Sequence, residues 1–464
     1  MYKRQVLDQL EKSGVKDNTL VIHISGDNGA SGEGTLQGSF NEANFFNGVP
    51  EPLAIIEKHI DQWGSNYTYP HYPVGWAWAM DTPFQWVKQV ASHYGGTRNG
   101  LVISWPGKIR DVGTIRSQWH HVIDIVPTIL EAVGIPQPDI VNGVKQKPIE
   151  GVSMVYTFND AKAPSRHTTQ YFEMLGNRGI YHDGWVACTT PSQLPWDIGR
   201  GGVPDVITGY QWELYHVDMD FSEGANLAEK YPAKLKELQD LFYAEAKKYN
   251  VLPINNNKFA LLNPSVRPSL TRGRDTFTYY PGMTRIPSGA APDILNRSFS
   301  VTADVVIPAS GGNGMVISQG DWFGGWGFYM LNGKLVYTFN MNGLYSADIA
   351  SSDKIAAGRH TLTMNFKYNG GGIAKGGIAT LLVDGMQVGQ GKIDVTTPVT
   401  VALDSDLSVG EATGTPLSDT FAVPFRFNGT LEQVTIKLEP IDPIAEQELL
   451  NVKPAAEMKK KISD

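Results

Sequence analysis

The sequence lacks a disulfide framework, because its 464 residues contain a single cysteine, Cys188. It also lacks an apolar run near the roughly 20 residues that a membrane-spanning helix needs, and its first residues show no apolar segment of the signal-peptide kind. Clusters of basic residues are scarce and the formal net charge is −8, which argues against nucleic acid as a partner. We therefore expect no membrane span, and we leave the location unassigned, with the cytoplasm as the default.

The most informative run is residues 18–29, where an apolar stretch leads into Asp27-Asn28-Gly29. Residues 19–24 are rich in β-branched side chains without alternation, which predicts a strand buried on both faces, as in a parallel sheet covered by helices. Open α/β sheets bind ligands beyond the carboxyl ends of their strands, where Asp27 and Asn28 would lie. Their oxygens suit Ca²⁺ or Mg²⁺, although Asp-Asn-Gly is also a common turn sequence.

The pattern of residues 1–255 predicts an α/β domain. Helical spacing and strand-like runs alternate along it, with helices expected over residues 5–16, 116–134 and 232–249 and a second apolar strand over residues 100–105.

A second domain is expected after this, because the chain is too long for one ordinary core. Residues 256–293 are polar and rich in arginine and proline, and we expect a connector packed on the first domain. Residues 294–440 contain short alternating strands divided by glycine clusters, which predicts an all-β jelly-roll sandwich. Residues 441–464 are expected to form a frayed helix and a charged tail.

Several short motifs of the first region occur in an order that resembles a known family. They are Thr19-Leu-Val-Ile with Asp27-Asn28-Gly29, Gly95-Gly96-Thr97-Arg98 before Leu101-Val-Ile-Ser-Trp-Pro106-Gly107, Ile123-Asp-Ile-Val-Pro127-Thr128-Ile-Leu130, and Glu213-Leu-Tyr with Asn226-Leu-Ala. Over roughly residues 15–255 this ordered set resembles the C-terminal half of type I, formylglycine-dependent arylsulfatases. The glycine-rich region that follows is similar to the lectin-like β-sandwich appended to some bacterial arylsulfatases.

The resemblance implies an alkaline-phosphatase-like fold and hydrolysis of a small sulfuric ester. It implies that Asp27 and Asn28 are ligands of a Ca²⁺ ion that also holds the sulfate oxygens, with Mg²⁺ the less favoured ion.

The family also places a lysine before the Gly-Gly turn, where its ammonium group pairs with the sulfate. Lys88 is the best match, and Gln85 or Gln89 takes this position under a different alignment. His93 stands just before the two glycines. We expect it to be a surface histidine, with a supporting role in the site as the alternative.

The nucleophile motif of the family is absent from this sequence. Sulfatases of this class convert the first residue of Cys/Ser-x-Pro-x-Arg to formylglycine. The proline after Cys188 stands one place too late, and residues 162–166 have the proline and arginine but begin with Lys162. The family's other metal ligands precede the Asp-Asn strand, and 26 residues precede Asp27 here. We therefore expect this chain alone to be inactive and to be a fragment, a relic or the partner of a separate N-terminal chain, with an apolar sheet edge left exposed at residues 19–24.

Two further features bear on ligands. Aromatic residues crowd residues 63–78, including Trp76 and Trp78, and predict a cleft wall that suits an aryl sulfate ester, with packing of the loop into its own core as the alternative. The other function class is a non-catalytic module, in which the sandwich binds carbohydrate or shields the first domain. Trp322, Phe323 and Trp326 could stack on sugars, although core packing is more common for such residues.

Overall fold

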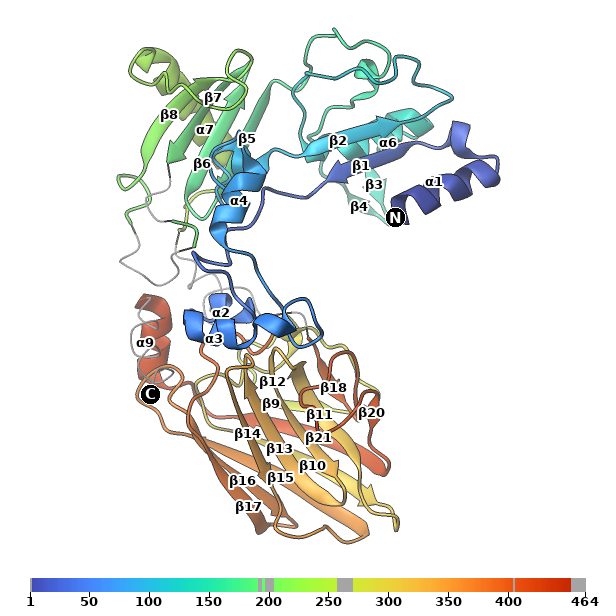
Figure 1. Ribbon diagram of the computed structural model, residues 1–464, viewed down its shortest axis with the longest axis vertical. Helices are drawn as coiled ribbons and strands as arrows, with labels where there is room; N and C mark the ends of the chain where they lie inside the picture. Colours follow the sequence, from blue (N-terminus) through green and yellow to red (C-terminus); the bar gives the residue numbers. More distant parts are fainter. Residues whose placement is uncertain (1, 191–193, 197–203, 257–269, 404, 452–464) are drawn as a thin grey trace. The chain divides into compact units, whose positions relative to one another are not determined.

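The chain forms two compact units that do not follow the sequence contiguously (Figure 1). The computed structural model describes residues 2–190, 194–196, 204–256, 270–403 and 405–451. The first unit contains residues up to 31, residues 77–195 and residues 204–256, and the second contains residues 32–76 and the C-terminal region. Residues 32–76, which the sequence pattern assigned to the first domain, thus belong to the second unit.

Buried asparagines explain why residues 32–76 belong with the C-terminal region. The Asn41 amide donates a hydrogen bond to the carbonyl oxygen of Phe323 at 2.9 Å, and Asn47 Oδ1 accepts one from the backbone N–H of Val399 at 3.0 Å. Both asparagines are 0% exposed. A buried amide is costly to leave without partners, so these contacts fix the segment on this unit.

The first unit combines short helices with small sheets. Its elements in chain order are α1 (Tyr2–Lys12), η1 (Lys16–Asn18), β1 (Val21–Ser25), α4 (Val74–Asp81, shared with the second unit), α5 (Tyr94–Thr97), β2 (Gly100–Ser104), η3 (Val122–Asp124), α6 (Ile125–Val133), β3 (Ile140–Val141), β4 (Val144–Lys145), η4 (Val155–Thr157), β5 (Thr169–Met174), β6 (Asn177–His182), β7 (Trp185–Thr190), β8 (Gln211–His216) and α7 (Pro232–Lys248). The expected helix over residues 116–134 is shorter than predicted. It holds Pro127 in its first turn and ends at Gly134, whose φ of 70° is left-handed.

The first apolar strand does not lie in a parallel sheet. β1 pairs only with β2 among the described residues, and the pairing is antiparallel, with Ile24 opposite Leu101 and His23 opposite Val102. Ile24 and Leu101 are each 39% exposed and Val102 is 61% exposed. The prediction of a strand buried on both faces is therefore wrong for this chain, because β1 has one neighbouring strand and the described residues cover its apolar faces only in part.

A four-stranded antiparallel sheet, in the order β5-β6-β7-β8, forms the best-packed part of the first unit. α7 lies along one face of it (Figure 1). Leu238, Phe242 and Ala246 are spaced four residues apart on α7, so they share one helix face, and all are 0% exposed against Ile180 and Leu214 of the sheet. This sheet presents Cys188 and Glu213 to the site described below.

The second unit is an all-β sandwich with short helices at residues 43–62 and a C-terminal helix, which confirms the predicted fold class. Its elements are α2 (Ala43–Phe46), α3 (Leu53–Lys58), η2 (Ile60–Gln62), β9 (Thr276–Tyr279), η5 (Ser288–Ala290), β10 (Phe299–Ile307), β11 (Gly314–Asp321), β12 (Gly324–Leu331), β13 (Lys334–Met341), β14 (Tyr345–Ala350), β15 (Gly358–Tyr368), β16 (Gly377–Val383), β17 (Met386–Ile393), β18 (Leu407–Val409), β19 (Glu411–Ala412), β20 (Phe425–Arg426), β21 (Thr430–Leu438) and α9 (Pro443–Asn451).

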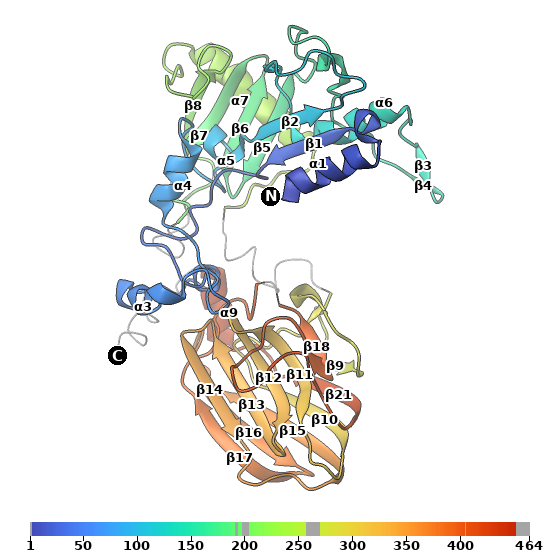
Figure 2. The ribbon, with the colours of Figure 1, turned by 45° about the vertical axis from the view of Figure 1, so that its right-hand side comes forward.

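Two sheets make up this sandwich, as Figure 2 shows. One has the order β17-β16-β15-β10-β21-β9, and the other runs β14-β13-β12-β11-β20-β19 with β18 paired to β11. β10 alternates buried and partly exposed residues along its whole length, the pattern of a strand with one face on a core. Trp326 and Phe328 of the facing sheet are 0% exposed in the same core.

Two of the expected boundaries differ from the structure. Within the predicted connector, β9 pairs with β21 as the edge strand of a sandwich sheet, so this part belongs to the second unit and not to the first. In the predicted tail, α9 places Ala445 and Leu449 in the sandwich core, so it is a packed helix. Residues 257–269 of the connector and 452–464 of the tail lie outside the described residues. Among the described helices, none combines the length and apolar character needed to cross a bilayer.

Candidate functional site

The Asp27-Asn28 loop follows β1 directly, at the position that the sequence predicted. Gly26 turns the chain with a φ of 88°, a conformation that glycine adopts without strain. Asp27 is exposed and Asn28 is partly buried. Neither side chain has a hydrogen bond or ion pair to another described residue. The two hard oxygen donors are thus uncommitted, which fits a role as ligands of a divalent cation.

Glycine backbone packing fixes this loop against the Gly-Gly turn. Gly29 N–H donates to the carbonyl oxygen of Gly96 at 3.0 Å. A Cβ atom on Gly29 would stand 1.6 Å from the carbonyl oxygen of Gly95, and one on Gly95 would stand 2.1 Å from that of Gln85. Any larger residue would therefore push the segments apart, so these glycines set the position of the Asp27-Asn28 loop.

The segment that carries Lys88 contacts the same loop through its backbone. Lys88 N–H donates to the carbonyl oxygen of Ala30 at 3.0 Å, and Asp81 accepts from Ala30 N–H at 2.8 Å. Trp86 and Gln89, on either side of Lys88, have φ values of 68° and 76°. Left-handed backbone at non-glycine residues stores strain and is concentrated at functional sites.

The three candidates for the sulfate-contact position lie in different surroundings. Lys88 is partly buried, whereas Gln89 is only 9% exposed. The Gln85 amide donates to the carbonyl oxygen of Glu223 and, at 3.5 Å, to the Tyr215 hydroxyl. Gln85 is thus held by Glu223 and by Tyr215 of β8, and Lys88 remains the best match, although its role stays a prediction.

Arg98 of the Gly-Gly-Thr-Arg motif is held by aromatic rings. Its guanidinium carbon lies 4.1 Å from the ring centroid of Phe221, 5.0 Å from that of Tyr94 and 5.2 Å from that of Phe84. Burial lowers the pKa of Arg98. Contacts of this kind are stabilising when the cation is desolvated, so Arg98 anchors the turn.

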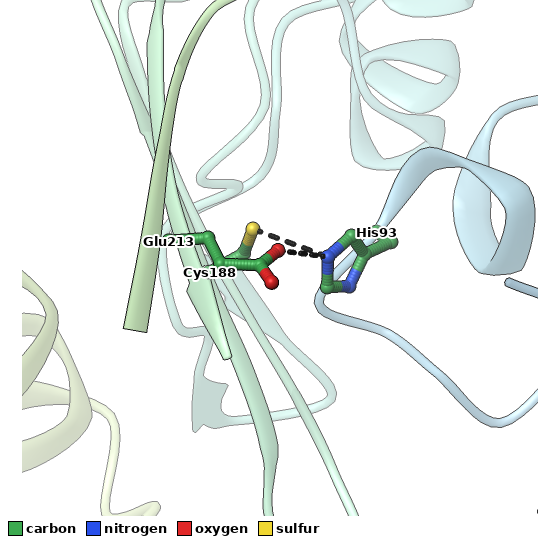
Figure 3. Close-up of side chains that lie close together, drawn as sticks. All are labelled: His93, Cys188 and Glu213. Carbon is green, nitrogen blue, oxygen red and sulfur yellow. Dashed lines mark hydrogen bonds and ion pairs between the residues drawn. The ribbon is translucent and has the colours of Figure 1, made fainter. Parts of the chain in front are cut away.

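His93 is not a surface residue, contrary to the expectation from the sequence, because it is 0% exposed. It points at Cys188 of β7 and Glu213 of β8, which lie opposite each other in the sheet register (Figure 3). His93 Nε2 lies 3.0 Å from Glu213 Oε2 and 3.6 Å from Cys188 Sγ, and its Nδ1 lies 2.9 Å from Ser92 Oγ. His93 is thus enclosed between its own turn and the sheet.

Charge is concentrated in this enclosed cluster. Burial would raise the pKa of Glu213, but hydrogen bonds from His93, Thr190 and Tyr215 lower it to about 2. Burial raises the pKa of Glu223 to about 7, and burial followed by the nearby carboxylates raises that of Cys188 well above its usual value. Without a cation, the cluster therefore holds one ionised carboxylate beside a neutral thiol.

Comparison with known proteins identifies the first region. Residues 4–135 match the family model for sulfatases.

This part of the chain is similar to the sulfatase family.

A relative from Schizosaccharomyces pombe, described as an uncharacterized sulfatase, is 29% identical over 237 residues, which cover 50% of this chain and 39% of the relative. The chain thus spans well under two thirds of the curated sulfatase that it matches.

Similarity to solved structures is weaker. A Bacteroides thetaiotaomicron structure concerned with metabolism of multiple glycosaminoglycans is 16% identical, with a TM-score of 0.31, and the match covers 52% of this chain and 41% of the other. The CBM40 domain of the Ruminococcus gnavus IT-sialidase is 12% identical, with a TM-score of 0.27, and the match covers 37% of this chain and 94% of the other. Scores this low do not establish a common fold.

Cys188 lies in the middle of β7 and is 0% exposed, so its thiol does not reach solvent in the folded chain. That a sulfatase nucleophile would have to come from outside this sequence stays a prediction.

The aromatic loop before the sulfatase turn divides between two surroundings. Trp76 and Trp78 on α4 are 65% and 44% exposed. In the second unit, the Tyr67 ring packs edge-on against Trp322 at 5.2 Å between centroids. Trp326 lies in the sandwich core and is unavailable to a ligand. The role of Trp76 and Trp78 in substrate binding stays a prediction.

Sequence reasoning did not find the His93 cluster. Cys188 and Glu213 are 25 positions apart, and His93 is a further 95 positions from Cys188, so no local motif joins them. The register of β7 with β8 brings the first two together, and this register follows from the tertiary fold. The sequence supplied one signal, the histidine that stands just before the glycine pair.

Proposed function

We propose that this chain supplies the cation-binding, C-terminal part of the catalytic domain of a sulfuric ester hydrolase. The observation that carries the proposal is the docking of the Asp27-Asn28 loop on the Lys88 segment and the Gly95-Gly96 turn. It holds two uncommitted oxygen donors beside the segment of a cationic side chain, which is an arrangement suited to a sulfate group.

In this proposal Asp27 and Asn28 would hold Ca²⁺, which when bound supplies positive charge for the sulfate oxygens. The ammonium group of Lys88 neutralises the ester at the same end of β1. Ca²⁺ takes six to eight oxygen ligands, and these residues supply two donors. The remaining ligands and the nucleophile would come from a sulfatase N-terminal half, as a separate chain or as part of a longer gene product.

The uncovered β1–β2 sheet supports the proposal that a sulfatase N-terminal half completes the domain. Ile24, Leu101 and Val102 present apolar side chains to solvent, although their sequence pattern is that of an interior sheet. A partner that adds strands beside β1 and β2 would bury these side chains and would satisfy their edge hydrogen bonds.

The direct experiment begins with the DNA upstream of the Met1 codon. An open reading frame there with a Cys/Ser-x-Pro-x-Arg motif would be co-expressed with this chain and a formylglycine-generating enzyme. We expect turnover of p-nitrophenyl sulfate that requires Ca²⁺. The variant D27A should lower kcat/KM by about 100-fold, and K88A by a similar factor.

The exposed lysine variant K58A is the matched control and should keep full activity. Full activity of D27A in the same assay would contradict the proposal.

A second candidate function is carbohydrate binding by the sandwich. The specific observation in its favour is the edge-on pair of Tyr67 and Trp322, since Tyr67 is 43% exposed and Trp322 is partly buried. A ring pair at the surface can stack on a sugar. Glycan binding by the full chain that Y67A abolishes, with sulfatase activity unchanged, would favour this function, and no binding to a broad glycan panel would reject it.

A further inference from the structure

Three metal-binding residue types meet at one enclosed point of the first unit. His93 comes from the turn before α5, Cys188 from β7 and Glu213 from β8 (Figure 3). The imidazole Nε2, the thiol Sγ and a carboxylate oxygen all lie within 4.8 Å of one another. His93 and Cys188 are 0% exposed, and the Glu213 side chain is 21% exposed.

The two distances from His93 to its neighbours are close to the edges of a tetrahedral zinc site. With bonds of about 2.0–2.3 Å, neighbouring ligand atoms around Zn²⁺ stand roughly 3.3–3.6 Å apart. His93 Nε2 lies 3.6 Å from Cys188 Sγ and 3.0 Å from Glu213 Oε2. The first distance equals a tetrahedral edge, and the second is a few tenths of an ångström short, so an ion would require the Glu213 carboxylate to move outward from His93.

A second, independent observation is the neighbouring carboxylate of Glu223. It is 0% exposed, and its Oε1 is buried without a hydrogen-bond partner among the described residues. Its Oε2 accepts from the N–H of Tyr94, the residue after His93, at 2.9 Å. A buried carboxylate oxygen without a donor is costly, and a cation nearby would offset that cost.

We propose that His93, Cys188 and Glu213 bind one Zn²⁺ ion, with Glu223 or a water molecule as the fourth ligand. Binding forms a zinc–sulfur bond and breaks the S–H bond of Cys188, whose proton leaves to solvent. No oxidation or reduction takes place. Ser92, through His93 Nδ1, and Tyr215, whose hydroxyl donates to Glu213 at 2.8 Å, orient the two ligands.

This site differs in chemistry and place from the Asp27-Asn28 loop. A thiolate and an imidazole select a borderline-soft ion, whereas Asp27 and Asn28 offer hard oxygens that suit Ca²⁺. The zinc ion would link β7 and β8 to the turn that carries Gly95 and Gly96. Its role is structural, because the site is enclosed and the ion would brace the surface on which the Asp27-Asn28 loop docks.

The single cysteine makes the test specific. Any sulfur-to-metal charge-transfer band of a Co²⁺-substituted form must come from Cys188. The untagged full chain would be produced with added Zn²⁺ or Co²⁺ and dialysed against a weak chelator. We expect one metal ion per chain by elemental analysis, with a charge-transfer band and tetrahedral d–d absorption in the Co²⁺ form.

Substitutions distinguish the loss of a metal ligand from a loss of the fold. C188A should lose the charge-transfer band, and E213Q should keep it with affinity at least about tenfold lower. H182Q, at a histidine of the same sheet outside the cluster, is the matched control and should keep both band and stoichiometry. The wild-type measurement does not depend on whether the variants fold. A natively folded wild-type chain that retains no metal and shows no band, or metal binding that is equal in C188A, overturns the proposal.

Discussion

The sheets of the two units differ in how far the chain itself covers them. In the sandwich, β10 alternates buried and partly exposed positions, and Val301, Ala303 and Val305 are 0% exposed. In the first unit, no residue of β1 or β2 reaches full burial, and Val102 is 61% exposed. The sandwich supplies its own second layer, whereas the apolar pattern of β1 and β2 belongs to an environment that the described residues do not complete.

This contrast indicates which parts of the chain are stabilised by contacts within the chain itself. Burial of apolar surface is the main favourable term in folding, at about 25 cal/mol per Å². The sandwich and the α7-covered sheet bury apolar surface against other parts of the same chain. The β1–β2 pair gains little stabilisation from such burial, although it positions the candidate cation ligands.

The largest effect is expected in the sandwich core. W326A removes a side chain that is 0% exposed between Phe299 and Tyr337. It should lower the free energy of unfolding of this unit by about 3–5 kcal/mol, because a large cavity remains. Calorimetry of the full chain would measure it, and an unchanged sandwich transition would break the contrast between the units.

A buried polar network should give the next largest effect. The Asp124 carboxylate, 0% exposed, accepts hydrogen bonds from His120 Nδ1 at 2.9 Å, His167 Nδ1 at 2.8 Å and Val152 N–H at 2.7 Å. D124A should cost about 3 kcal/mol in the first unit, because these donors lose their acceptor in a buried place.

The pH dependence of this network follows from the same contacts. Burial opposes ionisation, but the hydrogen bonds from His120 and His167 outweigh it and lower the pKa of Asp124. Its contribution is therefore present above the unfolded pKa near 3.8 and is lost as the pH falls below it. D124N should reduce the loss of unfolding free energy at acid pH, as measured by urea titrations. An unchanged pH dependence would show that Asp124 is not the group responsible.

Glu51 should show the opposite pH dependence in the second unit. Burial raises its pKa from 4.5 to about 7, against the hydrogen bonds from Asn44 and the N–H groups of Phe40 and Asn41. Between these pH values the folded chain holds a proton that the unfolded chain has lost, so stability falls as the pH rises. The loss is on the order of 3 kcal/mol. E51Q should remove this dependence of stability on pH. If the dependence persists in E51Q, another group is responsible for it.

The smallest stability effect is expected at the uncovered sheet. V102T changes a side chain that is already 61% exposed and should alter stability by less than about 0.5 kcal/mol. V102D should similarly preserve the fold while it reduces self-association in analytical ultracentrifugation, because it places a charge on the apolar surface. A loss of several kcal/mol in V102T would mean that the sheet is covered after all.

Much of this architecture could be predicted from local patterns. The strand end just before Asp27, the helix stop at Gly134 and the alternating strands of the sandwich follow from residue spacing and turn chemistry. The regrouping of residues 32–76 could not be predicted, because it depends on hydrogen bonds between Asn41 and residues about 300 positions away. The His93 cluster was missed for the same reason, since strand register brings its members together.

Amide hydrogen exchange of the full chain, read by mass spectrometry, tests the central contrast most directly. We predict that the amides of β1 and β2 exchange by local opening, orders of magnitude faster than those of β10 and β15 in the sandwich core. If the proposed N-terminal sulfatase half is supplied, the exchange of β1 and β2 should slow selectively. Equal protection of the two sheets in the isolated chain would contradict the account.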